Sequence, residues 1–234
     1  MNDHRAILFD LDDTLFNSAG AFKMGLFTTL REHPLTTSFD PQLIYETLQQ
    51  HRLALWKQVF AGEINFVEYR RHRIGHTLQT LGIDADTLEI DDFNRHFARN
   101  YVNAIVPDRE VIEIIERLAS RYSLGIITNG HAEITHEKVM RLGLSPYFKA
   151  DHIILSEDRG IPKPDVRIFA EGLAPHGVRP DQTVFVGDSF ESDVLGAIHA
   201  GMKSVWIRLD GAVPSTNDQP FAIISHLREL EPLL

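Results

Sequence analysis

Cysteine is absent from this chain of 234 residues, and its absence removes several kinds of chemistry at once. Without thiols there can be no disulfide, no cysteine nucleophile and no cysteine-ligated metal. A chain without cysteine suits a reducing compartment. The start of the chain, Met1–Arg5, is polar and lacks the pattern of a secretory signal. We therefore expect a cytoplasmic protein.

Long apolar runs and an excess of basic residues are also missing. No uninterrupted apolar stretch approaches the roughly 20 residues that a membrane-spanning helix needs. The 23 Lys and Arg residues face 33 Asp and Glu residues, which gives a formal net charge of −10. Such a chain has no broad basic field with which to bind nucleic acid or an anionic membrane. We expect neither partner, whereas a small phosphorylated ligand needs only a few local groups.

What the sequence does contain is a short apolar strand that runs into carboxylates. Residues 5–10 predict a strand buried on both faces of a parallel sheet, and Asp10, Asp12 and Thr14 follow at once. Charge at the end of a buried strand is costly, so it requires a cation, a set of hydrogen-bond donors, or both. Asp-rich turns are also common after strands, so this motif alone does not decide its function.

Residues 17–103 carry only helical patterns. Asp40-Pro41 is a strong helix start, and Asn65 with Glu68 has the spacing of a capping box. We expect four helices here, inserted directly after the first strand.

From residue 104 onward, strands alternate with helices, which is typical of a parallel, doubly wound sheet. We expect an α/β catalytic core of residues 1–16 plus 104–234, with a helical cap domain of residues 17–103. The expected strands after residue 104 are 122–128, 153–155, 183–187, 204–207 and 222–224, with helices over 191–200 and 226–234 among the elements between and after them.

Polar groups stand at the carboxyl ends of four of these strands. They are Asp10 to Thr14, Thr128 to Gly130, Lys163, and Asp188 to Asp193. Ligands of open α/β sheets bind at this edge, so we expect the four groups to converge. Carboxylates without cysteine suit Mg²⁺, and a hydroxyl, main-chain N–H groups and a lysine suit a phosphate. A carboxylate can attack phosphorus, and a second carboxyl can serve as general acid and base.

Four motifs in these groups carry a family resemblance: FDLDDTLF (9–16), ITNG (127–130), KPDVRIF (163–169) and VGDSFESD (186–193). The chain resembles the haloacid dehalogenase-like (HAD) hydrolase superfamily, in the branch whose helical cap follows the first motif. The resemblance implies a Rossmann-like core that uses Mg²⁺. It makes Asp10 the nucleophile and a metal ligand, and Asp12 the general acid and base, with its main-chain carbonyl on the metal.

The same resemblance implies roles for later residues. Thr128, Asn129 and Gly130 would bind the substrate phosphate, and Lys163 would pair with both Asp10 and the phosphate. Asp188 would be a metal ligand, and Asp193 would orient metal-bound water or Lys163. Relatives that cleave carbon–halogen or carbon–phosphorus bonds lack an acid at the place of Asp12, so its presence favours phosphate esters.

The cap is where we expect the substrate to be selected. Trp56, Phe60 and Tyr69 could stack on a base, although the helical spacing of Leu53, Trp56 and Phe60 also suits packing inside the cap. The basic run Arg70–Arg73 could bind an anion or could be a solvated helix face. The segment LWKQVFAGEINFVEY resembles bacterial pyrimidine 5′-nucleotidases, and FDLDDTLFNSAGA resembles acylneuraminate 9-phosphatases.

We therefore expect a Mg²⁺-dependent phosphate-monoester hydrolase that works through an aspartyl-phosphate on a small phosphorylated metabolite, such as a nucleoside 5′-monophosphate. Phosphatases of sugar phosphates or sugar acids, of the acylneuraminate 9-phosphate or phosphoglycolate type, are alternatives. A phosphomutase would use the same Asp10 while shielding the aspartyl-phosphate from water. A binding module without activity would have no need of the complete set of chemical groups.

Overall fold

The computed structural model describes residues 4–208 and 217–234. The chain divides into two compact units: Met1–Ser18 with Val106–Leu234, and Ala19–Ile105. We call them the core unit and the cap unit. Among the residues that the structure describes, no helix combines the length and the apolar character needed to cross a membrane.

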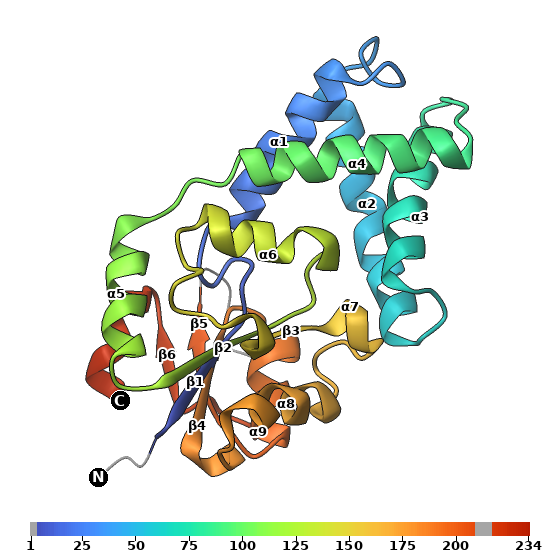
Figure 1. The fold of residues 1–234 in the computed structure, drawn as a ribbon. Helices are drawn as coiled ribbons and strands as arrows, with labels where there is room; N and C mark the ends of the chain where they lie inside the picture. Colours follow the sequence, from blue (N-terminus) through green and yellow to red (C-terminus); the bar gives the residue numbers. More distant parts are fainter. Residues whose placement is uncertain (1–3, 209–216) are drawn as a thin grey trace. The chain divides into compact units, whose positions relative to one another are not determined.

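The core unit is built on a six-stranded sheet in the order β3-β2-β1-β4-β5-β6, in which every neighbouring pair is parallel (Figure 1). The predicted α/β class with a parallel, doubly wound sheet is confirmed. The strands are β1 (Ala6–Phe9), β2 (Ser123–Thr128), β3 (Ile153–Leu155), β4 (Thr183–Gly187), β5 (Lys203–Ile207) and β6 (Ala222–Ile224).

The first strand is central because its side chains are apolar throughout and suit burial on both faces. All four residues of β1 are fully buried, and Leu8 lies opposite Gly125 of β2 and Phe185 of β4. Strand β1 therefore places whatever follows it in the middle of the carboxyl edge of the sheet.

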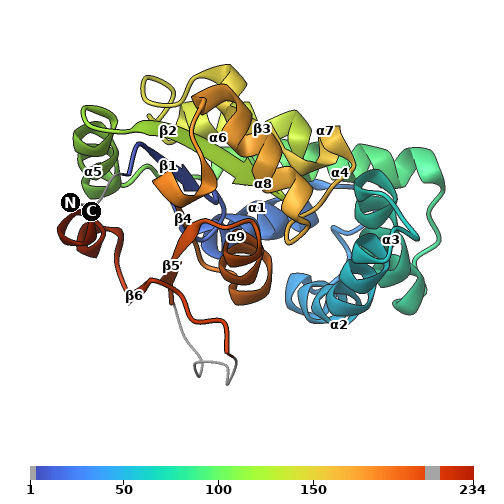
Figure 2. The same ribbon diagram turned by 90° about the horizontal axis from the view of Figure 1, so that it is seen from below.

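Helices of the core unit cover the sheet and bury its apolar side chains. They are α5 (Arg109–Ala119), α6 (Ala132–Arg141), α7 (Ser156–Arg159), α8 (Val166–Leu173) and α9 (Gly196–His199). Helices α8 and α9 pack on one face in a single cluster with Leu8 and Phe185, and the rings of Phe169 and Phe185 meet edge to face at 5.1 Å. Full burial of such a side chain contributes about 1.5–3 kcal/mol. Figure 2 shows this sheet from a perpendicular direction, with β6 at the edge opposite β3.

The cap unit is helical. Its elements are α1 (Ser18–Glu32), α2 (Pro41–Phe60), α3 (Phe66–Thr80) and α4 (Thr87–Asn103), of which α2 and α3 lie side by side in both ribbon views (Figures 1 and 2). The expected helix starts are present. Asp40 accepts the N–H of Gln42 before Pro41, and Asn65 and Glu68 exchange two bonds of 2.9 Å in a capping box.

One predicted helix is wrong, and another is present but differs in its first turns. Residues 226–234 form two short 3₁₀ turns, Leu227–Glu229 and Glu231–Leu233, because Pro232 has no N–H for a continuous helix. The segment 191–200 begins as a π-helical stretch, Phe190–Leu195, before α9 starts at Gly196. Stretches of π-helix often lie at functional sites, and this one carries Asp193.

Candidate active site

The structure places Asp10 one residue beyond β1, where it is only 7% exposed. Its N–H still donates to the carbonyl of Val186, so the backbone keeps the direction of the strand. The chain then turns sharply, and Asp13 takes a φ of 61°. Asp tolerates this left-handed conformation better than most residues. The turn brings the Thr14 hydroxyl to 3.3 Å from Asp10 Oδ2 and 3.4 Å from Asp188 Oδ1.

Lys163 joins two buried carboxylates. Its Nζ donates to Asp10 Oδ1 at 2.6 Å and to Asp193 Oδ1 at 2.7 Å, and the lysine is 1% exposed. The side-chain amide of Asn129 holds the lysine's main chain, accepting its N–H at 2.9 Å and donating to its carbonyl at 3.1 Å. Asn129 thus positions the lysine, a contact that we did not predict from the sequence.

Asp188 and Asp193 come from the end of β4 and from the π-helical stretch. Trp206 of β5 donates to the main-chain carbonyl of Asp188 at 2.8 Å. Asp193 accepts the N–H of Ser189 at 3.0 Å and lies so close to Gly187 that a Cβ there would stand 2.5 Å from its carboxyl group. Within the described residues, Asp10, Asp188 and Asp193 offer ligand oxygens that lie within 4.8 Å of one another.

The protein alone does not compensate the charge of these carboxylates. Burial raises the pKa of Asp10 well above its usual value, and repulsion from Asp193, Asp12 and Asp188 adds to this despite the opposing effect of Lys163. Burial, with repulsion from Asp193, raises the pKa of Asp188 to about 7. Burial alone would lower the pKa of Lys163, but Asp10 and Asp193 outweigh it and raise the pKa. The lysine therefore stays charged, and the remaining negative charge fits a divalent cation held by oxygen ligands.

Asp12 has a different partner from Asp10. Both of its carboxylate oxygens accept hydrogen bonds from Lys138 Nζ of α6, at 2.8 and 3.1 Å. Lys138 is 2% exposed, and we missed it from the sequence although a signal was there. Ile134, Thr135, Lys138 and Val139 form the buried stripe of α6, and a lysine in such a stripe needs an anionic partner.

Thr128 and Gly130 stand beside Asp12. A Cβ on Gly130 would lie 2.7 Å from Asp12 Oδ2 and 2.9 Å from Thr128 Oγ1, so only glycine fits this turn. Thr128 is buried, and its hydroxyl oxygen accepts the N–H of Gly130 at 2.9 Å, which leaves the hydroxyl proton as a donor.

The main-chain N–H groups after Thr128, which we expected to bind phosphate, are partly bonded to the protein's own oxygens. The N–H of Ala132 donates to Glu157 at 3.0 Å, and that of Gly130 is directed to Thr128. Thr128 also does not cap the helix: the residue at the N-cap position is His131, whose side chain makes no capping bond.

The three aromatic residues that we singled out in the cap lie together within the cap unit. Trp56 stacks on Phe60, with ring centroids 5.5 Å apart, and lies 4.7 Å from Tyr69. Tyr69 is buried and belongs to the cluster of Leu55, Val59 and Phe66, whereas Phe60 is 47% exposed. Packing thus accounts for Tyr69, and of the three residues Phe60 offers the most surface.

The basic run of α3 divides between two environments. Arg71 binds Asp91 through two hydrogen bonds of 2.7 Å. Arg73 lies over the rings of Phe22, Tyr69 and Phe97, at 5.2–5.6 Å from their centroids. The run is therefore not one uniform surface patch.

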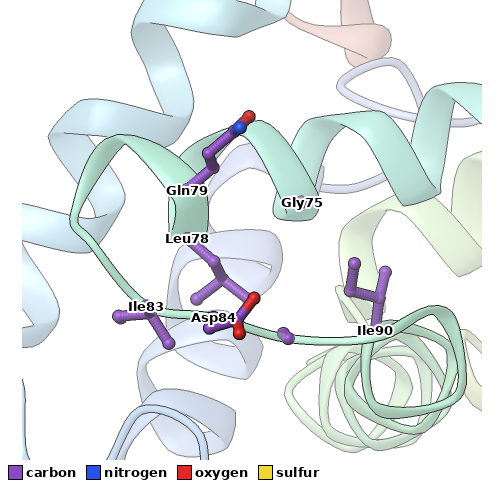
Figure 3. Close-up of a pocket in the computed structure, with 7 residues that line it drawn as sticks. Gly75, Leu78, Gln79, Ile83, Asp84 and Ile90 are labelled. Atoms are coloured by element: carbon purple, nitrogen blue, oxygen red, sulfur yellow. The ribbon is translucent and has the colours of Figure 1, made fainter.

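A hollow of about 260 Å³ lies in the cap unit between the end of α3, the following loop and the start of α4 (Figure 3). Leu78, Ile83 and Ile90 are drawn around it, together with the polar side chains of Gln79 and Asp84. One carboxylate and one amide do not form a catalytic group, so we assign the hollow no function.

Comparison with known proteins agrees with this architecture. Residues 4–201 match the model of the haloacid dehalogenase-like hydrolase family. The pyrimidine 5′-nucleotidase YjjG of Escherichia coli is 28% identical over 230 residues, covering 97% of this chain and 96% of its own. The glyceraldehyde 3-phosphate phosphatase of Methanothermobacter thermautotrophicus is 30% identical over 209 residues, covering 87% and 85%.

Among solved structures, the putative HAD-hydrolase YfnB of Bacillus subtilis, bound to magnesium, superimposes with a TM-score of 0.81. It is 25% identical, and the match covers 99% of this chain and 98% of that one.

The chain belongs to the haloacid dehalogenase-like hydrolase family, as its motifs indicated. Within that family it is an enzyme of the phosphatase type.

Proposed function

We propose that the protein hydrolyses phosphate monoesters through an aspartyl-phosphate on Asp10, with the core unit carrying the chemistry and the cap unit selecting the substrate. One observation carries this proposal: Asp10, Lys163 and Asp193 form a buried group with the partly exposed Asp188 beside them, and the acid Asp12 stands beside Thr128 and Gly130. An acidic nucleophile, a fixed cation and a separate carboxyl group are the parts that this reaction needs.

In the first step a carboxylate oxygen of Asp10 attacks phosphorus, and the bond from phosphorus to the ester oxygen breaks. Lys163 and the Thr128 hydroxyl stabilise the charge on the phosphoryl oxygens. Asp12 gives its proton to the leaving oxygen, and Lys138 then stabilises the carboxylate that remains.

In the second step Asp12 takes a proton from water, and the resulting hydroxide attacks phosphorus and releases Asp10. Inorganic phosphate is the product. The position of Lys138 keeps Asp12 oriented through both proton transfers, while Lys163 holds the carboxylate of Asp10 in place.

The residues present fit Mg²⁺, which Asp10, Asp188 and the main-chain carbonyl of Asp12 would hold, with Asp193 next to them. Bound there, the ion would neutralise charge on the phosphate and favour the ionised form of Asp10. YfnB, a relative of the same fold, binds magnesium, which supports this choice.

The test is release of inorganic phosphate from an aryl phosphate in the presence of Mg²⁺. Asp10→Asn should lower kcat by about a thousandfold or more, because an amide is a poor nucleophile. Asp12→Asn should accumulate a protein that is heavier by one phosphoryl group, visible by mass spectrometry, because water then lacks its base. Asp181→Asn, a change of an exposed carboxylate of the core unit, is the matched control. Normal turnover by Asp10→Asn would refute the mechanism, as would full activity after chelation.

For the substrate we propose a nucleoside 5′-monophosphate. The relative YjjG, which is a pyrimidine 5′-nucleotidase, and the exposed ring of Phe60 support this choice. The experiment is a comparison of kcat/KM for pyrimidine and purine monophosphates, sugar phosphates and small phospho-acids. Phe60→Ala should raise KM severalfold for nucleotides and leave it unchanged for glyceraldehyde 3-phosphate. Leu88→Ala, at another exposed apolar position of the cap unit, is the control.

Faster hydrolysis of triose or sugar-acid phosphates would instead favour the second candidate, a sugar-phosphate phosphatase. The similarity to the glyceraldehyde 3-phosphate phosphatase of Methanothermobacter thermautotrophicus supports this candidate. Slow net hydrolysis that depends on a bisphosphate activator would indicate a phosphomutase. Halogenated acids belong in the same panel, and we expect no halide release.

A further inference from the structure

A second group of metal-type ligands lies in the cap unit. His33, Asp92 and His96 each offer one ligand atom, and these three atoms lie within 4.8 Å of one another. Asp92 Oδ2 is 3.3 Å from His33 Nε2 and 3.9 Å from His96 Nδ1. Ligand atoms about 2 Å from one tetrahedral ion stand about 3.3 Å apart, so small rotations would close these distances onto a single ion.

The helices bring these three side chains together without the help of an ion. Asp92 and His96 are four residues apart on α4 and therefore share one face of that helix. His33 follows the end of α1, where its N–H donates to Thr29 and its carbonyl accepts from Thr36. Asn100 of α4 binds both Thr29 and Glu32 at 3.1 Å, which holds the two helices together beside the group.

The side chains are also held and accessible in the way that a binding site requires. The His33 ring is buried, at 4% exposure, and makes edge-to-face contacts with the rings of Phe93 and His96. Asp92 and His96 are 51% and 35% exposed, so an ion can enter and keep water as its fourth ligand.

We propose that His33, Asp92 and His96 bind a divalent transition-metal ion of the Zn²⁺ type. Two imidazoles and a carboxylate suit Zn²⁺, Ni²⁺ or Cu²⁺, whereas Mg²⁺ prefers oxygen ligands. The ion would link the end of α1 to the middle of α4 and stabilise the cap unit.

Two neighbouring hydrogen bonds show which contacts a bound metal ion would keep and which it would break. Arg95 donates to Asp92 Oδ1 at 3.0 Å and leaves Oδ2 facing the histidines. The N–H of Leu35 points to His33 Nδ1 at 3.4 Å, a long and weak bond. When His33 binds the ion through Nε2, its ring proton moves to Nδ1. Nδ1 can then no longer accept the N–H of Leu35, and this hydrogen bond is lost.

The experiment is a Zn²⁺ titration of the full chain in excess Mg²⁺, which occupies oxygen-ligand sites. Imidazole ¹⁵N spectra should show one equivalent of Zn²⁺ bound to Nε2 of His33 and Nδ1 of His96, with no such change from Mg²⁺ alone. Calorimetry should show that His96→Ala and Asp92→Asn each weaken Zn²⁺ binding by roughly 100-fold or more, since even indirect partners of a metal are worth 10–100-fold.

The matched control is His76→Ala. His72 and His76 have the same four-residue spacing on α3 and stack at 5.3 Å, but they belong to no group of three ligands within the described residues. We expect this variant to bind Zn²⁺ as tightly as the wild type. The proposal is overturned if the imidazole signals of His33 and His96 do not respond to Zn²⁺, or if His76→Ala loses binding and His96→Ala keeps it.

Discussion

Ion pairs of nearly equal length lie in the two units of this protein, in opposite surroundings. In the core unit Lys163 binds Asp10 and Asp193 at 2.6 and 2.7 Å, and all three side chains are less than 10% exposed. In the cap unit Arg71 binds Asp91 at 2.7 Å, with the two side chains 41% and 25% exposed. The distances are alike, so the contrast between the two places comes from burial and from the neighbouring charges.

Burial reverses the effect of pairing on the carboxylate. Arg71 lowers the pKa of Asp91, chiefly through its hydrogen bond. The pKa of Asp10 is raised in spite of Lys163, because burial and three other carboxylates outweigh the lysine. A paired charge in the cap is satisfied, whereas the ionised form of Asp10 in the core needs further positive charge, which a bound cation can supply.

The strongest test of this contrast is Lys163→Met. Two buried carboxylates would lose their cation, which costs about 3–5 kcal/mol of stability, and phosphate release should fall by about 100- to 1,000-fold. Urea unfolding and steady-state kinetics measure the two effects. Lys149→Met, at an exposed position, is the control. A Lys163→Met protein as stable as the wild type would show that burial does not govern these pairs.

Lys138→Met is expected to have the next largest effect, because Lys138 is buried but its partner Asp12 is 26% exposed. Water can replace part of the lost interaction, so the loss of stability should be smaller than for Lys163. We expect kcat to fall by about 10- to 100-fold for alkyl phosphates, whose leaving group takes a proton from Asp12 in the proposed mechanism.

Aryl phosphates, with their better leaving groups, should be affected less by Lys138→Met. An equal loss for both kinds of ester would mean that Lys138 does not act through Asp12.

These two lysines also show what could be predicted from the sequence. The positions of Asp10, Thr128, Lys163 and Asp188 follow from strand ends, because parallel strands bring their carboxyl ends to one edge of the sheet. Lys138 lies in the middle of a helix, where the alternation of strands and helices says nothing about contacts with a loop 126 residues away.

Side-chain direction was the other information that could not be predicted. The spacing of TNG marks a loop at a strand end, but only the folded chain shows that the Asn129 amide turns toward the main chain of Lys163. In the same way, Trp56 and Phe60 have a helical spacing that both packing and substrate binding would produce, and Tyr69 follows on the next helix. The structure separates the buried Tyr69 from the half-exposed Phe60.

His176, a partly buried histidine of the core unit, shows how burial makes the stability of the protein depend on pH. Burial, followed by repulsion from His152, lowers the pKa of His176 to about 4. Its Nδ1 lies 2.7 Å from Ser123 Oγ, and its buried Nε2 has no partner among the described residues. An unfolded histidine titrates near 6.5, so below that pH the unfolded chain binds more protons and stability falls as the pH falls toward 4.

His176→Gln should remove this contribution to the pH dependence, which is of order 1 kcal/mol once solvent screening of the partly buried ring is allowed for. Chemical denaturation between pH 7 and pH 4 measures the difference between the two proteins. Curves that stay parallel over this range would contradict a depressed pKa.

The smallest effect is expected from Arg71→Gln, the counterpart of the Lys163 change. Asp91 would return to water without a buried charge being left, and the pKa of Asp91 would rise toward its usual value. Thermal denaturation should show a decrease of no more than about 2–4 °C, and kcat and KM should be unchanged. A clear rise in KM for anionic substrates would show instead that Arg71 serves the substrate. The exposed pair of Arg71 and Asp91 would then contribute to substrate binding. In that case burial alone would not separate the functional ion pairs of this protein from the others.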